Sequence, residues 1–197
     1  MHRQRHSGPS GFTAVELLLT VAVLATVFAI AVPMLGNILD EMRTSLAAQY
    51  LAGRVRNLRF EAIRRSTAIA LRFEAGMPDY TFAPFADGNR NGLRTAEILD
   101  GTDPSLGSTE RLSDNFSSVR FGLIDGIPDV DGVSPAGTEG VRIGLSRILT
   151  MAPNGTATSG TLYIRGERSQ YAVRVLGATG RTRVLRYDRG TRRWITR

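Results

Sequence analysis

The chain contains no cysteine and no lysine, and its only histidines are His2 and His6. Without cysteine there is no disulfide, no thiolate nucleophile and no cysteine-ligated zinc. If residues 1–11 are removed, histidine is lost as well, and the usual acid–base and nucleophilic side chains are then missing. An enzyme would have to rely on carboxylates, hydroxyls and arginine alone, so we expect a protein that is not an enzyme.

Positive charge is concentrated near the C-terminal end of the sequence. The formal net charge is +7, and the last 17 residues alone carry seven arginines and one aspartate. The remainder of the chain is therefore close to neutral. A basic patch of this kind suits contacts with phosphate groups, which makes nucleic acid a candidate partner of these residues.

A long apolar run follows Glu16 near the start of the chain. No charged residue occurs between Leu17 and Leu39, and a helix of that length, about 35 Å, crosses the hydrocarbon core of a bilayer. The residues alone allow a signal peptide cut after Ala31 or a plain membrane anchor oriented by the basic leader. In either case, Thr13-Ala-Val-Glu16 fits the capping box of a helix N-terminus.

The segment Gly-Phe-Thr-Ala-Val-Glu-Leu-Leu, residues 11–18, resembles the class III leader of type IV pilins and type II secretion pseudopilins. The resemblance implies a prepilin leader peptide of residues 1–11, cut between Gly11 and Phe12 by prepilin peptidase, with N-methylation of Phe12. It also implies a helix kink at Pro33.

The same resemblance gives Glu16 a role in filament assembly. A lone carboxylate deep in a bilayer costs about 2.5–3.5 kcal/mol on insertion scales. In a filament it can pair with the terminal ammonium of an adjacent subunit, because opposite charges attract strongly away from water. We therefore expect Glu16 to drive assembly with other pilin-like subunits.

Apolar residues recur at three- and four-residue steps as far as residue 65, and the pattern alternates every second residue beyond it. The sequence predicts an N-terminal helix, 12–65, that is apolar all round over 12–39 and amphipathic over 40–65. The remainder, 66–197, is predicted to be a β-rich globular head. The predicted strands are 67–74, 79–85, 118–123, 140–145, 161–165, 170–177, 182–188 and 192–196. The expected fold class is α+β, with the long helix packed on a mainly antiparallel sheet.

Residues 148–165 and 171–184 resemble the C-terminal half of the GspH/FimT family of minor pilin-like subunits. Residues 76–140 match nothing in that pattern. The resemblance implies a minor subunit of a type II secretion pseudopilus that supports protein secretion across the outer membrane. It also implies a single-pass inner-membrane protein with a cytoplasmic N-terminus and a periplasmic head, later incorporated in the filament.

An alternative function follows from Gly180-Arg-Thr-Arg183, which resembles the G-R-x-R stretch of FimT-type minor pilins that bind DNA for uptake. Val184 follows, where those proteins favour a polar or aromatic residue. The residues that would contact DNA are Arg181, Arg183, Arg192 and Arg193. Strand alternation places Arg181 and Arg183 on one face and Arg186 on the other, so the arginines do not form one stripe.

Two loops rich in aspartate and glycine, 86–109 and 124–139, interrupt the strands. The first opens with the pattern Asp-x-Asn-x-Asn-Gly of a calcium loop, at Asp87, Asn89, Asn91 and Gly92. The closing twelfth position falls on Ile98, and Glu97 stands one residue early. We therefore favour a turn-rich surface loop without metal, and calcium is the weaker alternative for both loops.

Overall fold

A single long helix, α1 (Ala14–Arg65), begins the described part of the chain. The structure, a computed structural model, describes residues 11–132 and 139–197, without the side chains of residues 32 and 33. The proposed leader is therefore outside the described residues except for Gly11. The helix continues through position 33 without a break in its assignment, and the kink at Pro33 stays a prediction.

The chain divides into two compact units, one ending at Ile38 and the other spanning Leu39–Arg197. The first unit contributes the apolar part of α1. The second unit, called the head below, contains the rest of α1 and all the strands.

The head contains two antiparallel sheets. The first has the order β3-β2-β1-β6, and the second has the order β10-β9-β8-β7-β4, with β5 also paired to β7. The strands of the first sheet are β1 (Ile69–Glu74), β2 (Thr81–Ala86), β3 (Glu110–Arg111) and β6 (Ile148–Met151). Those of the second are β4 (Arg120–Phe121), β5 (Val141–Arg142), β7 (Gly160–Arg165), β8 (Gln170–Leu176), β9 (Arg181–Asp188) and β10 (Arg193–Thr196). Two short helices, α2 (Thr95–Asp100) and α3 (Leu112–Asn115), lie in the connections.

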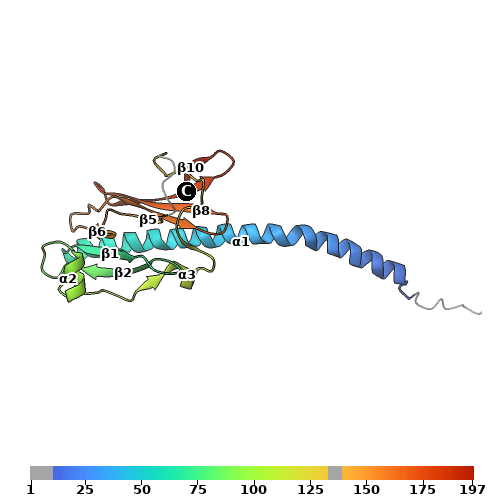
Figure 1. Ribbon diagram of the computed structural model, residues 1–197, viewed down its shortest axis with the longest axis horizontal. Helices are drawn as coiled ribbons and strands as arrows, with labels where there is room; N and C mark the ends of the chain where they lie inside the picture. Colours follow the sequence, from blue (N-terminus) through green and yellow to red (C-terminus); the bar gives the residue numbers. More distant parts are fainter. Residues whose placement is uncertain (1–10, 133–138) are drawn as a thin grey trace, which may run out of the picture. The chain divides into compact units, whose positions relative to one another are not determined.

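Within the head, the helix lies between the two sheets (Figure 1). One hydrophobic core joins Leu51 and Val55 of α1 to Leu71 of the first sheet and Val173 of the second. The helix residues buried in this core are Ala47, Ala48, Leu51, Ala52, Val55, Leu58 and Ala62. Their spacing of three and four positions is the amphipathic pattern expected from the sequence. The α+β fold is confirmed.

Several predicted elements differ from the structure. The loop 86–109 contains the helix α2, and the predicted strand 118–123 shortens to the two residues of β4, Arg120 and Phe121. The strand β6 is not among the strands that alternation predicted, because three of its four residues are buried and it shows no alternation. Only the resemblance of residues 148–165 to the GspH/FimT pattern implied a short strand there. The division of the head into two sheets was also not expected.

Candidate functional site

The apolar part of α1, Ala14–Ile38, presents its side chains outward. All its described residues are exposed except Ala31, which is half-buried. Large side chains such as Leu18 and Phe28 are 70% and 62% exposed. An 18-residue window of this helix has a mean hydropathy of 2.5, so by length and composition the helix can cross a membrane. Apolar surface of this extent marks a contact with lipid or protein.

Glu16 forms the predicted capping box at the start of α1. Its Oε2 accepts the backbone N–H and the hydroxyl of Thr13, both at 2.9 Å, and its own N–H donates to Thr13 Oγ1 at 3.3 Å. Both hydrogen bonds that the described residues donate to this carboxylate fall on Oε2, and the Glu16 side chain is exposed. Within the described residues Oε1 accepts no hydrogen bond, so capping and a role in assembly are compatible. Phe12, beside it, is 86% exposed.

Asp40 fixes the head to the beginning of its segment of α1. The buried carboxylate accepts the backbone N–H groups of Glu167, Arg168 and Ser169 at 2.7, 3.1 and 2.8 Å. These residues form the turn between β7 and β8. Burial alone would raise the pKa of Asp40, but hydrogen bonds from the Ser169 side chain and from the three N–H groups lower it below its ordinary value.

A second cluster connects the C-terminal arginines to α1. Glu41 accepts the hydroxyl of Tyr171 at 2.5 Å and a guanidinium N–H of Arg186 at 3.1 Å. Arg197 donates to Ser45 and to the Tyr171 hydroxyl, both at 2.7 Å. Arg186 and Arg197, two of the seven C-terminal arginines, therefore join the end of the chain to α1. Sequence reasoning missed this role and that of Asp40, although an acidic pair directly after an apolar run was a signal for both.

The four candidate DNA-binding arginines form two separate pairs. Arg181 and Arg183 are exposed at the start of β9, where Arg183 lies opposite Arg174 of β8. Arg192 and Arg193 are exposed beyond the other end of β9. That strand of eight residues spans about 25 Å. The contact of Arg186 with α1 confirms that the arginines of β9 divide between its two faces.

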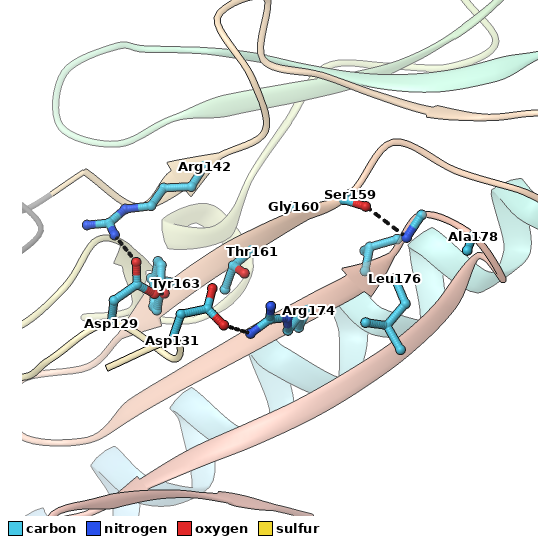
Figure 2. Close-up of a pocket in the computed structure, with 12 residues that line it drawn as sticks. Asp129, Asp131, Arg142, Ser159, Gly160, Thr161, Tyr163, Arg174, Leu176 and Ala178 are labelled. Atoms are coloured by element: carbon cyan, nitrogen blue, oxygen red, sulfur yellow. Dashed lines mark hydrogen bonds and ion pairs between the residues drawn. The ribbon is translucent and has the colours of Figure 1, made fainter. Parts of the chain in front are cut away.

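A cavity of about 460 Å³ lies on the outer face of the second sheet (Figure 2). Arg142 pairs with Asp129 at 2.5 Å, and Arg174 pairs with Asp131 at 2.6 Å. Each charged group that lines the cavity thus has a partner of opposite sign. The aspartates of the predicted loop 124–139 that lie here balance arginines, and residues 133–138 of that loop are outside the described residues.

The structure brings the calcium candidates of the first loop together. Asp87 is buried and accepts the N–H of Gly92, while Asn89 accepts the N–H of Asn91. In the described ranges, no three His, Asp or Glu side chains are grouped so that they could hold a metal ion. A metal site here would need amide or backbone oxygens as ligands.

Solved structures that are similar to this chain include two of a minor pseudopilin. One is the minor pseudopilin EpsH from the Type 2 Secretion System of Vibrio cholerae, with 16% identity, a TM-score of 0.46, and coverage of 73% of this chain and 97% of that chain. A second crystal structure of EpsH has 15% identity, a TM-score of 0.44, and coverage of 73% and 94%. No protein-family model and no curated protein matches the chain.

Proposed function

We propose that this chain is a minor pilin-like structural subunit of a type II secretion pseudopilus. The observation that carries the proposal is the exposed apolar segment of α1, which begins with a capped glutamate and continues into a folded head. The GFTAVELL motif at residues 11–18 supports the same function.

The apolar segment needs two successive environments. Before assembly, lipid covers side chains such as Leu18 and Phe28, because burial of apolar surface contributes about 25 cal/mol per Å². In the filament, helices of neighbouring subunits replace the lipid. Glu16 favours the filament over the membrane, because its carboxylate gains a cationic partner only when the terminal ammonium of an adjacent subunit is present.

The proposal implies three steps for the protein: membrane insertion, processing and assembly. The precursor lies in the inner membrane with its N-terminus in the cytoplasm and its head in the periplasm, as the basic leader favours. Prepilin peptidase cuts after Gly11 and the new terminal amine of Phe12 is methylated. The mature subunit then joins other pilin-like subunits and supports protein secretion across the outer membrane.

The intact mass of the membrane-extracted protein, produced with and without prepilin peptidase, tests this proposal. We expect loss of residues 1–11 and gain of one methyl group only when the peptidase is present. A Gly11→Leu variant is the matched control and should stay uncut. An uncut wild-type chain in both strains would indicate a plain anchor, and a cut after Ala31 would indicate a secreted head. Either result would contradict the proposal.

DNA capture is the second candidate function. It is favoured by Arg181 and Arg183, which are exposed on the same face of the second sheet as Arg174. The distance between this pair and Arg192–Arg193 favours contacts with phosphates at two separate places over one continuous stripe. Duplex DNA binding should then weaken with increasing salt.

The double variant Arg181→Ala with Arg183→Ala tests DNA capture. We expect weaker binding to duplex DNA and a lower salt dependence, measured by fluorescence anisotropy on the full chain in detergent. The matched control is Arg64→Ala with Arg65→Ala, at the end of α1, which should bind like the wild type. Equal loss in both double variants would indicate a nonspecific charge effect and would exclude this site.

A further inference from the structure

A buried carboxylate oxygen in loop 87–97 has no partner in the protein. Asp87 is 7% exposed, and its Oδ2 accepts the backbone N–H of Gly92 at 2.8 Å. That bond joins the first and sixth positions of the loop. Its Oδ1 is buried and accepts no hydrogen bond from the part of the chain that the structure describes. A buried anionic oxygen without a donor favours a cation at that place.

Further oxygen atoms surround the same turn. Arg90 and Gly92 have φ values of +63° and +92°, so the chain curls tightly after Asp87. The Asn89 Oδ1 accepts the N–H of Asn91 at 3.2 Å inside this curl. In a calcium loop of this pattern the first, third and fifth side chains and the seventh backbone carbonyl coordinate the ion. Here those positions are Asp87, Asn89, Asn91 and Leu93.

Glu97 closes the loop although it stands one residue before the expected position. Its Oε1 accepts the side-chain N–H of Asn91 at 2.8 Å, so α2 carries the carboxylate back onto the loop. Its Oε2 is buried and has no hydrogen-bond partner among the described residues. A second unpartnered carboxylate oxygen therefore lies beside Asn91, the fifth position, although Glu97 is one residue early in the sequence.

Asp103 stabilises the conformation of the loop through two hydrogen bonds to its backbone. It is 1% exposed, and its two oxygens accept the N–H groups of Gly88 at 3.0 Å and Arg94 at 3.3 Å. The loop therefore does not depend on a bound ion for its shape. The nearest cation to the Glu97 carboxylate is Arg94, at 3.7 Å. The Arg94 guanidinium is exposed and lies against Oε1, so Oε2 of Glu97 remains available to a small cation.

We propose that this loop binds one calcium ion. The ligands are oxygens of Asp87, Asn89, Asn91, Glu97 and the Leu93 backbone. Calcium fits better than magnesium, because it accepts six to eight oxygen ligands in flexible geometry, whereas magnesium demands a near-ideal octahedron. With only two coordinating carboxylates, the dissociation constant falls in the range of extracellular modules, about 10⁻⁴–10⁻³ M. The site is independent of the filament role, since a plain anchored head would contain it as well.

Calorimetric titration of the full chain in detergent, freed of metal with EDTA, tests the site. We expect one calcium bound per chain with a dissociation constant of about 10⁻⁴–10⁻³ M. Asp87→Asn and Glu97→Gln should each weaken binding about tenfold or more, because each removes a charged ligand. Asp131→Asn is the matched control from the second acidic loop and should leave binding unchanged.

We expect both variants to fold in the absence of metal. Asp87→Asn retains a side-chain oxygen for the Gly92 N–H, and urea unfolding in EDTA, followed by the fluorescence of Trp194, checks this. If Asp87→Asn unfolds, Glu97→Gln decides alone. Absence of binding at about 10 mM calcium, well above the expected range, would overturn the site. Equal affinity in wild type and Glu97→Gln, or magnesium binding as tight as calcium binding, would also overturn it.

Discussion

Asp40 accepts the backbone N–H of Ser169 at 2.8 Å, although 129 positions separate the two residues in the chain. The carboxylate lies at the beginning of the head segment of α1, and Ser169 lies in the turn before β8. This contact, with those from Glu167 and Arg168, joins the helix to the second sheet at a single buried carboxylate.

Asp40→Asn should destabilise the head. An amide is uncharged and presents only one acceptor oxygen, so all three N–H groups lose a charged partner and at least one loses its acceptor, at a cost of about 1.5–3 kcal/mol. Urea unfolding of the full chain in detergent, followed by Trp194 fluorescence, measures this loss. Asp114→Asn is the control, because Asp114 is largely exposed and its ion pair with Arg111 is long, at 3.8 Å. That variant should change stability by less than about 0.5 kcal/mol. Equal effects of the two substitutions would contradict the role of Asp40.

Acid should remove the contribution of Asp40. The pKa of this group is lower in the folded protein than the ordinary 3.8, so the unfolded chain binds the proton first as pH falls. The stabilisation is therefore complete above about pH 5 and is lost as pH falls through the folded pKa, below about pH 4. Unfolding curves of wild type and Asp40→Asn at a series of pH values, from about pH 6 down to below about pH 4, measure this loss. The difference in their unfolding free energies should shrink toward low pH, and a constant difference would show that the carboxylate charge is not responsible.

Gly166→Ala should weaken the same contact from the opposite side. A Cβ at this position would lie 2.1 Å from Asp40 Oδ1 and 2.4 Å from Thr44 Oγ1. One of these groups must move, and such overpacking costs about 1–3 kcal/mol. Gly190→Ala is the matched control, since its Cβ would meet only the Asp188 carboxylate at 3.6 and 3.9 Å. Thermal unfolding of both variants tests the difference, and an equally stable Gly166→Ala protein would show that the turn is loose.

Much of the fold follows from local patterns. The helix was predicted to within two residues because apolar positions recur at helical spacing from Leu46 to Ala62. The strands β7, β8 and β9 were predicted because each lies beside a glycine-containing turn and is rich in β-branched and aromatic residues. These signals lie within about ten residues of sequence, which is why the sequence alone reveals them.

The contacts that define the sites could not be predicted in the same way. The bonds of Asp40 to the β7–β8 turn, and of Arg197 to Ser45, join residues that are distant in sequence. The spacing of residue types along a short segment of sequence does not indicate which distant residue each one contacts. The position of Glu97 depends on where α2 begins, and its register appeared wrong until that helix was known. The Thr13–Glu16 capping box, by contrast, was fully predictable because its partners are three residues apart.

Two single variants, Glu16→Gln and Thr13→Ala, distinguish the role of Glu16 as a helix cap from its role in filament assembly. Glutamine can still form a capping box but has no charge, whereas Thr13→Ala removes the side-chain partner and preserves the carboxylate. The measurement is the fraction of processed subunit recovered in sheared filaments from cells that express the other subunits. We expect Glu16→Gln to reduce this fraction about tenfold or more, since the charge pair is lost, and Thr13→Ala to leave it nearly unchanged. Normal recovery of Glu16→Gln, with loss only in Thr13→Ala, would make Glu16 a helix cap alone and contradict the account of assembly.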